Sequence, residues 1–153
     1  NSDEKLFIDR LKKYCDDNPS AFIEKRLYLL RNKSKIGVGF FEAGNFYPDF
    51  IMWIAEDDKQ YITFIDPKGI MMLEKNINNP KIQFYKTIKE KEAQLQPSCT
   101  EKQIILNSFI ISGTPAADAS AHFGVRRPEF ESRNVLFLED DDCIEKMMSK
   151  VYL

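Results

Sequence analysis

Three charged residues lie at the ends of an apolar stretch near the middle of the chain. Asp49 directly precedes the apolar run 50–55, and Asp66 and Lys68 close the run 61–68. The acidic segment between the two runs is typical of a turn, so the stretch predicts a β-hairpin. This pattern is the part of the sequence best suited to chemistry, because it brings acids and a lysine to one end of a hairpin.

The register of the hairpin decides whether these side chains meet. A turn at 57–58 places Asp49 directly opposite Asp66. Opposed residues of an antiparallel pair share a face, with Cβ atoms roughly 4.5–5.5 Å apart. Lys68 returns to the same face because strand side chains alternate with a period of two. The sequence therefore predicts two carboxylates side by side with an ammonium next to them.

Two facing carboxylates repel each other unless positive charge lies between them. Mg²⁺ accepts one or two carboxylates and completes its shell with water and substrate phosphate, so Asp49 and Asp66 predict a site for Mg²⁺ or Mn²⁺. The alternative is a hairpin whose polar ends only reach solvent. Lys68, beside a proline that cannot join the strand ladder, favours chemistry over that alternative.

Composition limits the class of protein. The chain has 153 residues, 43% of them hydrophobic and 12% aromatic, which predicts one globular domain with a single core. Its net charge of −2 is not that of a typical nucleic-acid-binding domain, which carries a basic face. Any such binding must use local charge or another part of a larger protein. The first residue is Asn1, so we expect a fragment of a longer chain.

Localisation follows from what the sequence lacks. No apolar run approaches the ~20 residues of a membrane helix, and no signal peptide is visible. The chain has 3 cysteines, an odd number, and no pair has zinc-ligand spacing. We therefore expect reduced thiols, a cytoplasmic protein and no membrane partner.

Hydrophobic periodicity predicts an α/β fold, with a central mixed sheet that contains an antiparallel meander flanked by helices. Glu24 lies beside the apolar stripe of the second expected helix, where most glutamates are simply solvated. Glu42 ends the strand that precedes the hairpin. The expected helices are 3–14, 18–31, 80–96, 116–124 and 143–152, and the expected strands are 36–42, the two hairpin strands, 102–112 and 134–138.

Two further charged segments have open interpretations. The helix 80–96 has a lysine-rich side, formed by Lys81, Lys86, Lys89 and Lys91, that is either a solvated face or a phosphate contact. The acidic run 139–142 is expected to cap the last helix, because acidic residues suit the positive end of a helix. Metal binding by this run is the alternative.

The order of these features resembles the PD-(D/E)XK nuclease superfamily, which has the restriction-endonuclease-like fold. The signature here is Pro48-Asp49 followed by Asp66-Pro67-Lys68. Over residues 20–70 the chain looks more closely like the C-terminal nuclease domain of type III restriction-like DEAD/DEAH-box helicase proteins. The phrases that carry this likeness are 27–32, 37–41, 46–50 and 61–69.

The resemblance implies roles for individual residues. Asp49, Asp66 and the backbone carbonyl of Pro67 would hold Mg²⁺, and Lys68 would orient the attacking water and stabilise charge on the phosphate. Glu24 would be the helix glutamate of the motif, with Glu42 as a competing candidate. Many relatives have glutamate in place of Asp66, which leaves the number of metal ions open.

The resemblance also implies a function. It is that of an Mg²⁺-dependent DNA endonuclease in a restriction or helicase-type defence protein, with an N-terminal helicase/ATPase region in the full chain. The alternative is a catalytically silent DNA-binding or assembly module of a helicase. A third possibility is a nuclease that acts on RNA or on branched DNA.

Overall fold

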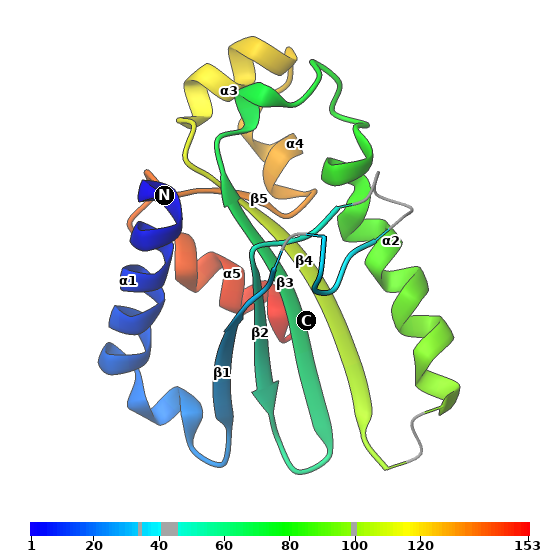
Figure 1. The fold of residues 1–153 in the computed structure, drawn as a ribbon. Coiled ribbons are helices and arrows are strands. Elements are labelled where there is room, and N and C mark those ends of the chain that lie inside the picture. The colour runs from blue at the N-terminus through cyan, green and yellow to red at the C-terminus, as the bar shows by residue number, and fades with distance from the viewer. Residues whose placement is uncertain (34, 41–45, 99–100) are drawn as a thin grey trace.

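The computed structural model describes residues 1–33, 35–40, 46–98 and 101–153. In this part of the chain five strands form one mixed sheet in the order β1-β2-β3-β4-β5, with helices on both faces (Figure 1). The antiparallel strands are β1 (Arg26–Arg31), β2 (Phe50–Ala55) and β3 (Lys59–Lys68), and the strands parallel to β3 are β4 (Gln103–Ser112) and β5 (Val135–Phe137). The sheet therefore changes from antiparallel to parallel at β3.

The helices divide between the two faces of the sheet. One face is covered by α1 (Ser2–Asp17) and α5 (Cys143–Val151). The other is covered by α2 (Pro80–Leu95), α3 (Ala116–Phe123) and α4 (Arg127–Glu131). Short 3₁₀ turns are η1 (Pro19–Phe22), η3 (Ile70–Met72) and η4 (Gln96–Ser98). Within the described residues, no helix combines the length and the apolar character needed to cross a bilayer.

Strand alternation explains why both faces need cover. Phe50 and Ile54 of β2 are buried against α1 and α5, whereas Phe64 of β3 packs with Phe84 and Ile88 of α2. Each such apolar side chain contributes about 1.5–3 kcal/mol when it leaves water. The two layers of helices therefore fix the sheet, and with it the ends of β2 and β3.

Most expected elements are present. The hairpin has the predicted register, with Ala55 opposite Gln60. The helices expected at 3–14, 80–96, 116–124 and 143–152 and the strands expected at 102–112 and 134–138 correspond to α1, α2, α3, α5, β4 and β5 to within a few residues.

The helix expected at 18–31 is wrong. After the 3₁₀ turn Pro19–Phe22 the chain becomes strand β1, which pairs antiparallel with β2. Glu24 has a φ of 62°, a left-handed conformation that ends any helix at this point. The strand is favoured because its backbone groups complete the ladder along the edge of β2, and Leu27 packs against the core on the α1 side.

The strand expected at 36–42 is also wrong. Among the described residues of this segment, 36–40, the sole pairing is a single antiparallel bridge from Phe40 to Phe46, and β1 takes the position beside β2 that this strand was expected to fill. The meander is thus β1-β2-β3. Glu42 lies outside the described residues.

Candidate functional site

The hairpin register brings the start of β2 and the end of β3 to the same end of the sheet. Phe50 pairs with Ile65, so Asp49 and Asp66 are the next residues outward on their strands. On its other side β3 runs parallel to β4 (Figure 1). Ligands in open α/β sheets commonly bind beyond the carboxyl ends of the strands, where the topology switches. Asp66 and Lys68 lie at such an end.

The two aspartates interact directly. Asp66 is almost completely buried and Asp49 is half-buried. Burial raises the pKa of Asp49 to about 7, and the hydrogen bond and negative charge of Asp66 add to the effect, with a smaller contribution from Glu4. A hydrogen bond between two carboxyl groups requires a proton on one of them. When Asp49 is ionised as well, the two carboxylates carry more negative charge than the single ammonium of Lys68 neutralises.

Lys68 supplies the nearest positive charge. Its ammonium contacts Oδ2 of Asp66 as an ion pair, without the alignment of a hydrogen bond. It also lies 5.3 Å from the centroid of the Phe46 ring, which shields it from water on that side. The structure thus brings Asp49, Asp66 and Lys68 together at one end of the sheet.

The carbonyl of Pro67 lies at the same end of the sheet and faces the β2 side of β3. The carbonyl of Lys68 accepts a hydrogen bond from the Gly113 amide at 3.0 Å, so it faces β4. Successive strand carbonyls point in opposite directions. The Pro67 carbonyl therefore faces the side on which Asp49 lies, beyond the start of β2. Proline has no amide proton, but this costs no ladder hydrogen bond here because the pairing with β2 ends at Ile65, before Pro67.

Glu24, the glutamate expected in the site, lies elsewhere. It occupies the turn before β1 and shares a shallow pocket with Glu56 and Asp57 of the β2–β3 turn. The pairing of Arg26 with Ala55 places it at the end of the sheet opposite to Asp49. The assignment of Glu24 to the site is wrong, because the expected helix is a 3₁₀ turn followed by strand β1, and the turn that carries Glu24 lies at the far end of the sheet.

A different helix glutamate, Glu4, reaches the site. Asn1 and Glu4 form a capping box at the start of α1, and this fixes the first turn of the helix. Glu4 is buried and accepts a hydrogen bond from Nη2 of Arg31 at 2.6 Å. That hydrogen bond lowers the pKa of Glu4. Glu4 also adds a small contribution to the raised pKa of Asp49, so it is a third acid near this end of the sheet.

The donor set fits a hard cation with water in its shell. Within the described part of the chain, no three acidic, histidine or cysteine side chains are gathered closely enough to enclose a metal ion. Asp49 and Asp66 with the Pro67 carbonyl nevertheless offer oxygen ligands of the kind that Mg²⁺ uses when water fills its other positions. The raised pKa of Asp49 shows that added positive charge would be favourable here.

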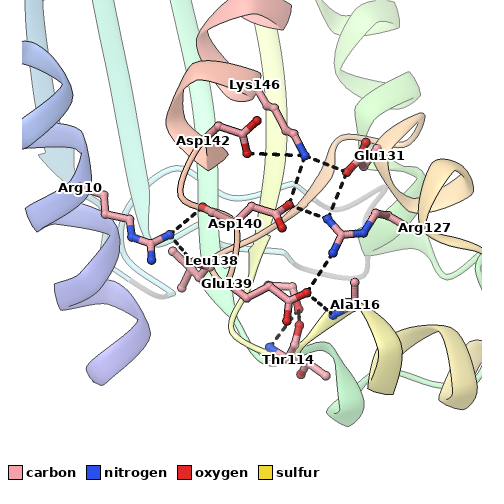
Figure 2. A network of polar contacts seen from close by, with 11 residues as sticks. Arg10, Thr114, Ala116, Arg127, Glu131, Leu138, Glu139, Asp140, Asp142 and Lys146 are labelled. Carbon is pink, nitrogen blue, oxygen red and sulfur yellow. Dashed lines mark hydrogen bonds and ion pairs between the residues drawn. The ribbon is translucent and has the colours of Figure 1, made fainter.

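The acidic run 139–142 is arranged differently (Figure 2). Oδ2 of Asp140 lies 2.6 Å from Nη1 of Arg127 and 3.2 Å from the ammonium of Lys146. Glu139 pairs with Arg127 at 2.9 Å. Asp142 is the N-cap residue of α5 but makes no side-chain capping bond. The run therefore serves chiefly to bind cations of α4 and α5, and its expected capping role is not seen in hydrogen bonds.

Comparison with known proteins adds no relative: no family model, no curated protein and no solved structure matches the chain.

Proposed function

We propose that this protein is an Mg²⁺-dependent phosphodiesterase that cleaves DNA and has a restriction-endonuclease-like fold. The observation that carries the proposal is the contact between Asp49 and Asp66, with the ammonium of Lys68 beside Asp66. A protein gains nothing in stability from a carboxyl whose pKa is raised by burial and by a second carboxyl beside it, as for Asp49. Their arrangement is explained if a cation and a phosphate complete the site.

The fold supports this assignment. An acid at the start of β2 and an Asp-x-Lys at the end of β3 occupy adjacent strands of a mixed sheet with helices on both faces. This is the arrangement that the resemblance to PD-(D/E)XK nucleases implies. Glu4 on α1 takes the place first given to Glu24, so a helix glutamate is still available to the site.

Asp49, Asp66 and the carbonyl of Pro67 would hold the metal ion. When bound, Mg²⁺ supplies Lewis acidity at the scissile phosphate and lowers the pKa of a water ligand. Asp49 must lose its proton to act as a ligand, and its pKa of about 7 makes that loss easy at neutral or slightly basic pH. Mn²⁺ accepts the same oxygen ligands and would replace Mg²⁺.

Lys68 stabilises the negative charge that develops on the phosphate. Its ion pair with Asp66 holds the ammonium at the end of β3, and the Phe46 ring keeps water from one side of it. A fixed charge of this kind is typically worth about 3–4 kcal/mol in the transition state. Lys68 also orients the attacking water by hydrogen bonding.

Arg31 and Glu4 support the acid pair. The hydrogen bond from Arg31 keeps Glu4 ionised, so Glu4 adds negative charge beside Asp49. That charge strengthens cation binding and provides an acceptor for a water molecule in the site. The wider assignment, a domain of a restriction or helicase-type protein with an N-terminal helicase/ATPase region, follows from the sequence resemblance.

A catalytically silent DNA-binding or assembly module is the second candidate. Two observations favour it: the ammonium of Lys68 is already engaged by Asp66, and the chain carries a net charge of −2. Such a module would bind DNA without cutting it, whatever metal is present.

Plasmid cleavage tests the two candidates. Wild type is incubated with Mg²⁺, with Mn²⁺ or with EDTA, beside Lys68→Ala and a matched control, Lys59→Ala, at the opposite end of β3. We expect metal-dependent cleavage by wild type and Lys59→Ala and none by Lys68→Ala. Equal cleavage by Lys68→Ala would reject the site. Binding of Mn²⁺ by calorimetry without any cleavage would identify the silent module.

A further inference from the structure

A second feature with chemistry of its own is a groove along the outer edge of β4, between α2 and α5. Its volume is about 480 Å³, within the range of ~300–1,000 Å³ typical of ligand sites. We call it the lysine groove. None of the described side chains that line it is acidic; they are Tyr85, Lys86 and Lys89 of α2, Asn107 of β4, Asn134, Lys150 of α5 and Leu153.

The groove exists because β5 is short. It pairs with β4 only from Ile110 to Ser112, so the preceding part of β4 has no strand on its outer side among the described residues. Side chains of α2 occupy that edge instead. Oε2 of Glu92 accepts a hydrogen bond from the Leu106 amide at 2.7 Å, and Oε1 of Gln96 accepts one from the Ile104 amide at 2.9 Å. Because these two amides already donate to side chains, they cannot pair with an added β-strand. Binding of a peptide as an extra strand of the sheet is therefore excluded here.

The lysines give the groove positive charge. The ammonium of Lys150 is partly buried and donates to the backbone carbonyl of Glu131 and to Oδ1 of Asn134, which are neutral oxygens. Burial lowers the pKa of Lys150, although the Glu131 carboxylate, itself paired with Lys146, opposes the effect. An ammonium that is desolvated without a carboxylate partner favours an anion beside it.

The α2 side of the groove adds an aromatic surface. The ammonium of Lys86 lies 5.8 Å from the centroid of the Tyr85 ring and has no carboxylate partner in the described part of the chain. Lys89 pairs with Glu92 at 3.0 Å. Aromatic rings between lysines are the combination by which proteins bind single-stranded nucleic acid, since bases stack on the ring and phosphates meet the ammonium groups.

We infer that the lysine groove binds a single-stranded segment of nucleic acid, with a base on Tyr85 and phosphates at Lys86 and Lys150. The inference rests on the proposed function for the class of its ligand. A groove of this volume admits individual nucleotides. A DNA duplex is wider than its own major groove, which is already about 12 Å across, so a duplex would touch only the rim.

The position of α2 connects the groove with the acidic site. The N-terminal end of α2 lies at the same end of the sheet as the carboxyl end of β3, and the helix runs from there along the sheet (Figure 1). Lys81, Tyr85 and Lys89 follow one another at four-residue spacing, which keeps them on one side of the helix over about 12 Å. A strand that leaves the site can therefore follow α2 into the groove.

Fluorescence anisotropy in EDTA tests the inference without cleavage. The probes are a labelled oligothymidylate of about 20 nucleotides, longer than the ~4–16 nucleotides that single-strand-binding domains cover, and a duplex of equal length. The variants are Lys86→Glu and Tyr85→Leu. Lys12→Glu, at an exposed position of α1 on the other face of the sheet, makes the same change in charge and is the control.

We expect wild type to bind the single strand more tightly than the duplex. Lys86→Glu should weaken binding about tenfold at low salt, and Lys86→Gln should reduce the slope of log K against log salt by about 0.7. Tyr85→Leu should weaken binding at least about fivefold, and Tyr85→Phe should restore it. The inference is overturned if Lys12→Glu weakens binding as much as Lys86→Glu, or if polyglutamate competes as well as the oligonucleotide, which would indicate an acidic protein partner.

Plasmid cleavage by the same preparations separates this inference from the proposed function. Loss of single-strand binding in the groove variants without metal-dependent cleavage by wild type supports the groove and rejects the nuclease. Cleavage by wild type together with single-strand binding that the groove variants leave unchanged rejects the groove and leaves the nuclease intact.

Discussion

Two groups of acidic residues in this protein have opposite electrostatic environments. Asp49 hydrogen-bonds to Asp66, and burial together with that carboxyl raises the pKa of Asp49 to about 7. Asp140 is also desolvated, which by itself would raise its pKa. Hydrogen bonds from Arg127 and Lys146 outweigh the desolvation, so the pKa of Asp140 is lowered (Figure 2).

The difference separates an acid group that stabilises the fold from one whose mutual repulsion the chain's own cations leave in place. Asp140 has its cations within the chain, so its ionised form contributes to stability. At the acid pair, the single ammonium of Lys68 contacts Asp66 and leaves the repulsion with Asp49 in place. Uncompensated charge of this kind is costly to the fold, and clusters of it are characteristic of functional sites.

The largest effect should come from Asp66→Asn, compared with Asp140→Asn. Removal of one charge from the acid pair should reduce Mg²⁺-dependent plasmid cleavage at least about 100-fold, because such groups are typically worth 10²–10³ in rate. Asp140→Asn should retain cleavage within about twofold, since Asp140 is bound by Arg127 and Lys146. Similar losses of cleavage in both variants would show that the two acid groups do not differ in function.

The next effect distinguishes two glutamates. Glu4→Gln should lower the cleavage rate about 10–100-fold, which is the usual cost of removing a residue that supports metal ligands. Glu24→Gln, at the opposite end of the sheet, should leave the rate unchanged. Single-turnover rates at saturating Mg²⁺ measure both. A loss in Glu24→Gln alone would return the helix-glutamate role to Glu24.

Stability should change in opposite directions at the two acid groups. Asp49→Asn should raise the free energy of unfolding by about 1–2 kcal/mol at pH 8, a value reduced from the full linkage effect because Asp49 is partly exposed. Asp140→Asn should lower it by about 1–2 kcal/mol, between the values for exposed and buried ion pairs. Urea unfolding of the metal-free proteins measures both free energies. A lower free energy of unfolding in Asp49→Asn than in wild type would contradict the repulsion between Asp49 and Asp66.

The dependence on pH sharpens this result. The folded-state pKa of Asp49, about 7, lies above the ordinary value of 3.8, so its contribution is present at low pH and is lost as pH rises from about 4 to 7. The increase in the free energy of unfolding that Asp49→Asn gives over wild type should therefore be absent at pH 4 and complete at pH 8. Asp140 has a lowered pKa, so its contribution is present above the ordinary aspartate pKa and is lost as pH falls below it.

The smallest effect is the stabilisation by metal. At a free Mg²⁺ concentration ten times the Kd, binding adds about 1.4 kcal/mol, or about 3–6 °C in Tm for a chain of this size. Asp140→Asn should keep this shift in a thermal melt and Asp66→Asn should lose it. An equal shift in Asp66→Asn would place the metal outside the acid pair.

The hairpin could be predicted from sequence because its determinants are local. Alternating apolar residues and a short acidic turn fix which residues oppose each other, and this is enough to bring Asp49, Asp66 and Lys68 to one end of the sheet. The strands β4 and β5 and the helices α2, α3 and α5 were predicted for the same reason, since each has its own periodic pattern and its own start or stop residue. The short helix α4 was not predicted, because its segment was expected to be a loop.

The segment before the hairpin could not be predicted in this way. Ile23, Leu27 and Leu30 fit helical spacing, yet Leu27 and Leu29 also fit a strand. The unpaired edge of β2 decides between the two, because only a strand can satisfy its backbone groups. No local pattern in 23–31 contains that information. The role predicted for Glu24 depended on the helix, so it was wrong as well.

The sequence alone determined the acid pair, because an antiparallel register follows from neighbouring residues. Only the tertiary structure decided which glutamate joins it. The capping box of Asn1 and Glu4 marks the start of α1, but Glu4 meets Asp49 and Arg31 only after α1 has packed against the sheet. A contact between residues so far apart in the chain depends on the packing of a whole layer, which no local spacing encodes.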